Sequence, residues 1–354
     1  MRVLFQNSGG IEGIVTVNVF GSLPATPPKG FVAIPEDPRL RATVKALAEA
    51  GGGAVETILL YGSHVQASNP SDSSAYDFLL ITDSYSKFFG RLVSNGHHSR
   101  PAWLLTALSF FLPPNIISFN TGTPNQPPAK CAVVSHRHLR RSLRNRFPDH
   151  FLKGRVVQTL SLVWSRGATE EEKVVSAVRK AREGIVVWVR PFLPGPFEIE
   201  EFAEKMLRVS YRGEIRPEAP ERVFQVFQAQ KDTVVAFARG ALEAAESRGE
   251  VVKEEGLYSW AQPPGPASRL LQSAYFTISK TRATARWFKY MITFNGWLDY
   301  IQSKIERRAG FEIEIQERDR RWPLIFLWPK LFFVLRTLKG PPSESEEKKE
   351  RKPE

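Results

Sequence analysis

The first half of the chain alternates short apolar segments with turn residues. Four segments are rich in aliphatic and β-branched residues, namely AVETILLY (54–61), AYDFLLIT (75–82), NIISFN (115–120) and KCAVVS (130–135). Segments of this length and composition predict β-strands. Before them, LRATVKALAEAGGG (40–53) has apolar residues at helical spacing and ends in glycines, which predicts a helix. We therefore expect a small mixed sheet with helices in this half.

After about residue 147 the apolar spacing becomes that of helices. Segments 168–189, 197–210 and 220–250 repeat apolar residues at helical spacing, so the second half is expected to be mainly α. The last residues, GPPSESEEKKERKPE, are charged and lack apolar side chains, which is typical of disorder. We expect an α+β protein with an N-terminal strand and linker (1–38), a sheet domain (39–150), a helical domain (151–310), an amphipathic segment (311–340) and a disordered tail (341–354).

Basic residues outnumber acidic ones in this chain. It has 49 Lys and Arg against 37 Asp and Glu, which gives a net charge of +12. This balance favours an anionic partner such as a nucleotide, a nucleic acid or an acidic lipid surface. No recognisable nucleic-acid-binding module occurs, so no nucleic-acid partner is expected. The single cysteine, Cys131, excludes an internal disulfide, and we expect it to pack within a strand.

A Gly-Ser pair and an aspartate mark the first two predicted strands. Gly62 and Ser63 directly follow the first strand, and Asp77 lies inside the second. If the strands are neighbours, backbone N–H groups and the Ser63 hydroxyl lie at the sheet end where Asp77 emerges. Such a site suits a phosphate group bridged to the carboxylate by a hard divalent cation. The alternative is an ordinary glycine turn beside an aspartate that caps a loop.

The spacing of Gly62, Ser63 and Asp77 resembles the signature of the DNA polymerase β nucleotidyltransferase superfamily. In most of its members a second acidic residue lies two positions after the first, and here that position is Leu79. The resemblance therefore implies that a second metal ligand comes from elsewhere in the chain.

Eight segments, including those that contain Gly62, Ser63 and Asp77, resemble one branch of that superfamily, the mitochondrial-type phosphatidate cytidylyltransferases, also called the mitochondrial translocator assembly and maintenance protein family. In chain order they are YGSHVQ, SAYDFLLITDSYSKFF, SNGHHSR, NIISFN, KCAVV, FLKGRV, VSYRGEIR and KTRATARWFKYMITFNGW. The resemblance spans about residues 58–304. It implies a polymerase β-like nucleotidyltransferase domain followed by a mainly helical domain that completes the active site. The implied reaction converts CTP and phosphatidic acid into CDP-diacylglycerol and pyrophosphate, with Mg²⁺ as cofactor.

The resemblance also implies roles for individual residues. Asp77, Glu214 and Lys130 would be catalytic, and Asp77 would ligate Mg²⁺ with Glu214, or in second place Asp83, as the further ligand. The nucleotide would be bound by Tyr61, Gly62, Ser63, Arg155 and Arg216, and the substrate phosphate by His97, His98, Lys280 and Arg282.

Each of these assignments has a structural alternative. Glu214 and Arg216 are spaced to form a surface ion pair, and Lys130 is also explained as a solvated strand end. His97 and His98 have no companion residues at zinc-site spacing. The Gly-Arg pair at 154–155 is explained equally by helix capping. The basic run 137–146 could grip phosphates, although most charge runs are solvated helix faces.

The C-terminal segment RRWPLIFLWPKLFFVLRTLKG (320–340) combines aromatic and cationic residues. This mixture suits the headgroup boundary of an anionic membrane, and the alternative is a helix docked on the protein's own core. The sequence shows no secretory signal. It also has no apolar run of the roughly 20 residues that a membrane-spanning helix needs. We therefore expect a peripheral enzyme on the cytoplasmic face of a bacterial inner membrane, or on the matrix side in a mitochondrion. The oligomeric state is left open.

Three functions are compatible with the sequence. The first is the lipid cytidylyltransferase. The second is a nucleotidyltransferase with a soluble or nucleic-acid acceptor. The third is a non-catalytic nucleotide-binding protein, which the leucine at position 79 favours.

Overall fold

The computed structural model describes residues 23–66 except residue 25, residues 74–123, 126–213 and 220–294, and residue 302. It also gives the backbone of residues 2–3 and 15–16. Residues 1–295 form one compact unit and residues 296–354 a second. Glu214, Arg216, the amphipathic segment 311–340 and the tail 341–354 lie outside the described residues.

The fold is α+β and is built on a five-stranded mixed sheet with the strand order β5-β6-β4-β3-β7. The strands are β3 (Val55–Tyr61), β4 (Tyr76–Thr82), β5 (Asn115–Phe119), β6 (Ala129–Ser135) and β7 (Ser161–Ser165). Strands β4 and β6 are parallel, and the other neighbours are antiparallel. The four strands predicted from sequence are confirmed. The fifth, β7, lies in the half that was expected to be mainly helical.

Helices cover both faces of the sheet. One face packs on α1 (Pro38–Gly51), α2 (Tyr85–Ser94) and α3 (Ala102–Phe111), and the other on α4 (His136–Ser142), α5 (Phe151–Val157) and α6 (Ala168–Glu183). Because alternate residues of a strand face opposite sides, Phe78 and Leu80 enter the first core and Leu79 and Ile81 the second. The sheet core thus continues well past the boundary expected at residue 150.

A third core forms the helical part of the unit. Its elements are α7 (Val186–Val189), α8 (Ile199–Ser210), α9 (Pro220–Ala229), α10 (Lys231–Ser247), the hairpin β8 (Val251–Glu254) and β9 (Leu257–Trp260), and the 3₁₀ turns Arg190–Phe192 and Tyr211–Gly213. Two segments that sequence periodicity treats as continuous are interrupted, one at Gly184 between α6 and α7 and one at Gln230 between α9 and α10. The short remaining elements are β1 (Arg2–Val3), β2 (Val15–Thr16) and the 3₁₀ turn Gly52–Ala54.

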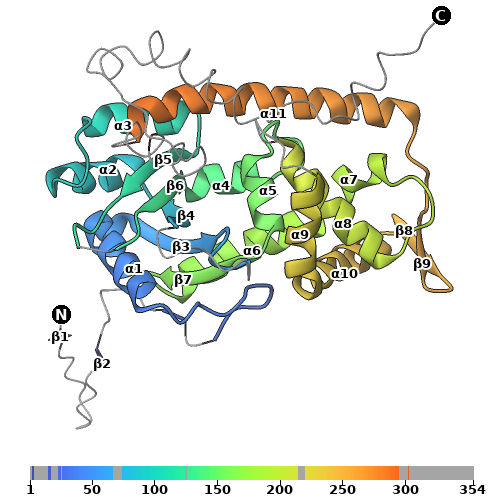
Figure 1. Cartoon of the computed structure of the whole chain (residues 1–354), viewed down its shortest axis with the longest axis horizontal. Helices are drawn as coiled ribbons and strands as arrows, with labels where there is room; N and C mark the ends of the chain where they lie inside the picture. The colour runs from blue at the N-terminus through green and yellow to red at the C-terminus, as the bar shows by residue number, and fades with distance from the viewer. Residues whose placement is uncertain are drawn as a thin grey trace, which may run out of the picture. The chain divides into compact units, whose positions relative to one another are not determined.

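The long helix α11 (Pro266–Thr293) runs past both the helical part and the sheet (Figure 1). Its residue Phe276 joins the core of the helical part, whereas its last turn reaches β5, where the Thr293 hydroxyl donates to the Ile116 carbonyl over 3.2 Å. This helix therefore ties the two parts of the unit together. Among the helices of the described residues, none is both long and apolar enough to cross a membrane.

Candidate functional site

The turn after β3 and the start of β4 meet at one end of the sheet. Tyr61, the last residue of β3, pairs with Asp77 of the antiparallel strand β4. Gly62 then adopts a φ of +80°, and a Cβ placed on it would lie 3.0 Å from Asp77 Oδ2. Both features favour glycine, because other residues rarely adopt this conformation and their side chain would crowd the carboxylate. The predicted proximity of the Gly62 turn and Asp77 is confirmed.

Lys130 joins this site from the neighbouring strand. Because β4 and β6 run parallel with Asp77 opposite Lys130, both side chains leave the sheet on the same face. The distance from Lys130 Nζ to Asp77 Oδ1 is 3.7 Å, and each side chain is about a quarter exposed, at 26% and 28%. A carboxylate and an ammonium group thus reach solvent side by side. The next residue, Cys131, is fully buried in the sheet core, as expected.

Arg155 reaches the same end of the sheet from α5. Its guanidinium lies 5.5 Å from the ring centre of Tyr61, the strand residue that precedes the Gly-Ser turn. The adjacent Gly154 is not a helix cap. It lies inside α5, where an added Cβ would come within 2.5 Å of the Ser210 carbonyl oxygen of α8. Its lack of a side chain lets α5 and α8 approach closely and so fixes the helix that holds Arg155.

The position that would hold a second carboxylate belongs to the core. Leu79 is 1% exposed and packs between the sheet and the α4–α6 layer. An ionised side chain there would lose its hydration without gaining a partner. Position 79 therefore serves packing, and of the two β4 positions only position 77 presents a carboxylate at this end of the sheet.

Asp83 cannot share a cation with Asp77. It follows the end of β4, whereas Asp77 lies at the beginning, and six strand residues span about 20 Å. Asp83 instead lies 3.8 Å from Lys87 and 3.9 Å from Arg166. The assignment of Asp83 as an alternative second ligand is wrong for geometrical reasons. Glu214, the preferred candidate, falls outside the described residues, as does Arg216.

His98 has a structural role rather than the phosphate contact expected from sequence. It is 4% exposed, its Nδ1 accepts from the Arg100 N–H over 3.0 Å, and its Nε2 donates to the Thr293 carbonyl over 2.9 Å. Burial lowers the pKa of this imidazole, so it is neutral near pH 7. With both ring nitrogens occupied, His98 links the α2–α3 loop to the end of α11.

His97 lies on the opposite face of the sheet from Asp77. Its ring centre is 5.1 Å from that of Phe119, which packs in the core with α1–α3. Asp77 shares its face with Leu79, which packs against α4–α6. Because the two side chains lie on different faces of the sheet, the structure does not place His97 in the Gly62–Asp77 site.

The two residues expected from α11 differ in their surroundings. Lys280 is exposed. Arg282 is ion-paired, with its Nε 3.0 Å from Asp149 Oδ2, so its charge is already matched within the protein.

Sequence reasoning missed a buried polar cluster around Asp149. Arg286 of α11, 1% exposed, makes a two-pronged ion pair with this carboxylate, one bond of which is 3.1 Å long. Burial opposes ionisation of Asp149, but Arg286 outweighs it and the carboxyl pKa falls. The segment FLKGRV pointed to Gly154 and Arg155 only, although its lysine, Lys153, belongs to this cluster.

Lys153 is completely buried beside Asp149. Its ammonium group donates to the Phe147 carbonyl over 2.6 Å and to the Tyr275 hydroxyl over 2.9 Å. Burial lowers the Lys153 pKa to about 7. The Tyr275 hydroxyl in turn lies 3.2 Å from Nδ1 of His150, whose pKa burial lowers to about 3. In its protonated form Lys153 can only donate, so Tyr275 then accepts from it and donates to the neutral His150.

Comparison with known proteins leaves the family open. No protein-family model and no curated protein matches this sequence.

A magnesium ion fits this sheet end only together with a phosphate ligand. Within the described ranges, no three His, Cys, Asp or Glu side chains gather in a way that could hold a metal ion. Mg²⁺ is commonly held by one or two carboxylates plus substrate phosphates and water, however, rather than by a cage of protein ligands. Asp77 supplies one such carboxylate beside a turn that suits phosphate. The described residues are thus compatible with a metal–nucleotide site.

Proposed function

We propose that this chain is a nucleotidyltransferase of the polymerase β-like fold that makes CDP-diacylglycerol from CTP and phosphatidic acid at a membrane surface. The observation that supports it best is the convergence of the Gly62–Ser63 turn, Asp77 and Lys130 at one sheet end. The substrates in this proposal come from the resemblance of the eight sequence segments and not from the geometry.

The proposed reaction needs charge neutralisation rather than a covalent nucleophile. A phosphate oxygen of the lipid attacks the α-phosphorus of CTP, and the bond to the β-phosphate oxygen breaks as pyrophosphate leaves. Two anionic reactants must therefore approach each other. The N–H groups of the Gly62–Ser63 turn and the Lys130 ammonium group would bind phosphate oxygens of the nucleotide.

Asp77 would hold the cation that accompanies CTP. Bound there, Mg²⁺ would withdraw negative charge from the triphosphate and so favour attack at the α-phosphorus. Lys130 lies close enough to Asp77 to offset its charge. With a cation held by Asp77, the Lys130 ammonium group would be available to a phosphate oxygen of the nucleotide. Arg155, stacked near Tyr61, would add a fixed positive charge at the edge of the site.

The experiment compares two aspartates, one at each end of β4. We expect Asp77→Asn to reduce pyrophosphate release from CTP and phosphatidate at least about 100-fold, since a lost metal ligand typically costs several kcal/mol of transition-state stabilisation. Asp83→Asn, at the far end of β4, should keep near-normal activity. Glu214→Gln in the same series tests the second ligand. Near-normal turnover by a folded Asp77→Asn protein would contradict the proposal.

A second candidate is a nucleotide-binding protein without turnover. It is favoured by the buried Leu79 and by the Lys130–Asp77 ion pair. CTP binding measured by calorimetry, without pyrophosphate release in the presence of phosphatidate or of a soluble phosphate ester, would support it. Release that needs only the soluble ester would instead support a transferase with a soluble acceptor.

A further inference from the structure

A second polar site lies on the α4–α6 face of the sheet, away from Asp77. It is an open groove of about 570 Å³ between α4 and α6. Helix α4 begins at His136, directly after the end of β6, whereas Lys130 lies near the start of that strand. Six residues of extended chain separate the two, about 20 Å. The groove is therefore a different site from the Gly62–Asp77 end.

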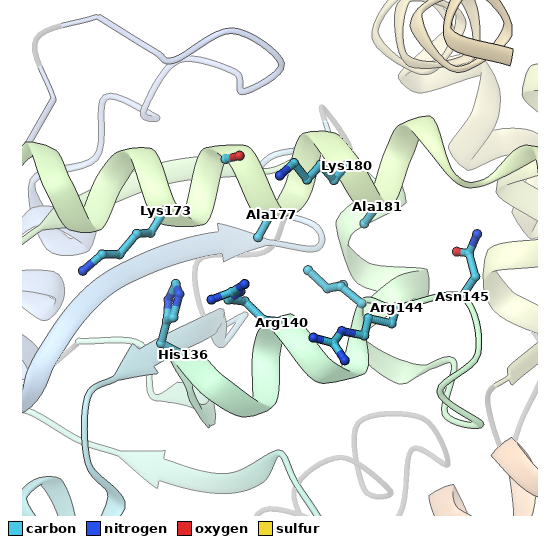
Figure 2. Close-up of a pocket in the computed structure, with 10 residues that line it drawn as sticks. His136, Arg140, Arg144, Asn145, Lys173, Ala177, Lys180 and Ala181 are labelled. Carbon is cyan, nitrogen blue, oxygen red and sulfur yellow. The ribbon is translucent and has the colours of Figure 1, made fainter. Parts of the chain in front are cut away.

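Cationic side chains from both helices line this groove (Figure 2). Arg140 lies on α4 and Arg144 in the turn just after it, whereas Lys173 and Lys180 are seven residues apart on α6 and so lie on one face of that helix. Figure 2 shows His136 and Arg140 pointing from α4 towards α6, with Lys173 above them.

These cations form no close ion pairs with carboxylates of the described residues, although Lys173 interacts at longer range with Glu56 and Glu170. No ion pair within 4 Å joins Arg140, Arg144, Lys173 or Lys180 to an acidic side chain in the described ranges. The nearby Glu56 and Glu170 already lie 3.6 Å and 3.0 Å from Arg166. Four like charges that face one groove repel one another. An anion bound between them would attract all four and offset this repulsion.

The groove's dimensions and lining indicate the class of anion. Lys173 and Lys180 leave α6 about 10 Å apart along its axis, so an elongated anion with several phosphate groups could contact cations along the length of the groove. Apart from the His136 ring, the described lining has no aromatic side chain on which a base could stack. Its remaining members are Leu143, Asn145, Ser176, Ala177 and Ala181. Recognition here would depend on phosphate groups rather than on a nucleobase.

We propose that the groove between α4 and α6 binds an anion that bears two or more phosphate groups. This inference does not rest on the proposed transferase activity, because the groove shares no residue with the Gly62–Asp77 site. The phosphates can belong to a soluble polyphosphate or to the clustered headgroups of an anionic membrane. Both sources present the same chemistry to the four cations, and experiment separates them.

The test measures binding of inorganic tripolyphosphate to the full chain by calorimetry, in about 0.15 M salt and with EDTA to remove divalent metals. The test variant is Arg140→Gln/Lys180→Gln. The matched control is Arg137→Gln/Arg179→Gln, which removes the same charge from exposed positions of the same two helices that do not line the groove. We expect the dissociation constant to rise at least about tenfold in the test variant and less than twofold in the control. Equal changes in both, or no binding by the unaltered chain, would overturn the proposal.

Two further measurements locate the binding and identify its source. Lys130→Gln should leave tripolyphosphate binding unchanged, whereas a loss confined to that variant would place the ligand at the Gly62 turn and overturn the proposal. Sedimentation with vesicles that contain phosphatidylglycerol gives the lipid comparison. Because segment 320–340 is itself expected to bind vesicles, the readout is the vesicle affinity of the test variant relative to the control. A weaker affinity in the test variant assigns the groove to lipid headgroups. Equal affinities together with lost tripolyphosphate binding assign it to a soluble polyphosphate.

Discussion

At the scale of single residues, Gly62 has the strictest geometrical requirement in the candidate site. Its φ of +80° suits glycine, and its missing side chain leaves room for Asp77. A glycine can be required for its backbone conformation, for the space it leaves, or for both. Gly249, which follows α10, has a φ of +69°, and a Cβ added there would meet no atom within 4 Å, so it isolates the first requirement.

We predict that Gly62→Ala and Gly249→Ala lower the free energy of unfolding by similar amounts, about 1–2 kcal/mol each, because both force alanine into a left-handed conformation. Only Gly62→Ala should also reduce nucleotide binding, since its methyl group displaces the Asp77 carboxylate. Urea denaturation and CTP titration of both variants check this. Unchanged CTP affinity in Gly62→Ala would show that the turn does not form the nucleotide site.

At the scale of secondary-structure elements, α11 depends on buried charges. Asp149, just before α5, receives Arg282 and Arg286 from this helix. Further along, Lys289 of α11 donates to the Pro114 carbonyl over 2.7 Å. A buried ion pair adds little net stability when complete, but removal of one partner leaves an uncompensated charge in the core. The two arginines differ in exposure, at 27% for Arg282 and 1% for Arg286.

We therefore predict that Arg286→Ala destabilises the fold by about 3–5 kcal/mol, because Asp149 loses its main counter-charge in the core. Arg282→Ala should cost only about 1 kcal/mol, since solvent replaces part of its interaction. Denaturant midpoints and slopes for the two variants measure the difference. Equal destabilisation would mean that Asp149 does not depend chiefly on Arg286.

At the scale of the whole molecule, the net charge of +12 and the aromatic, cationic segment 320–340 favour contact with an anionic surface. The segment lies outside the described residues. The described part of the candidate nucleotide site, by contrast, lies within residues 61–155. Membrane residence and nucleotide chemistry are therefore assigned to different parts of the chain and should be separable.

We predict that deletion of residues 320–354 lowers activity on phosphatidate in vesicles much more than activity on a short-chain, water-soluble phosphatidate. Each cation near an anionic leaflet contributes about 1 kcal/mol of binding, which the deletion removes without touching the sheet. Vesicle sedimentation at rising salt checks the charge dependence in the intact chain. If the truncated protein unfolds, or loses both activities equally, the segment belongs to the protein core.

The sequence by itself determined the α+β class, four of the five strands of the sheet and the meeting of Gly62 with Asp77. These features are local: apolar periodicity fixes which face of a segment is buried, and an antiparallel pair of adjacent strands brings the end of one to the start of the next. Lys130 was assigned to the site from sequence, but only the parallel register of β4 and β6 places it opposite Asp77.

Only the tertiary structure decided the features that depend on contacts between distant segments. It added β7 to the sheet, placed Asp83 at the far end of β4 from Asp77 and occupied both nitrogens of His98. It also united Asp149 with Arg286, 137 residues away. No local pattern indicates such partners, because burial and the low polarity around a group are set by whatever elements pack against it, and these determine which charged residues are paired and which remain available to bind a ligand.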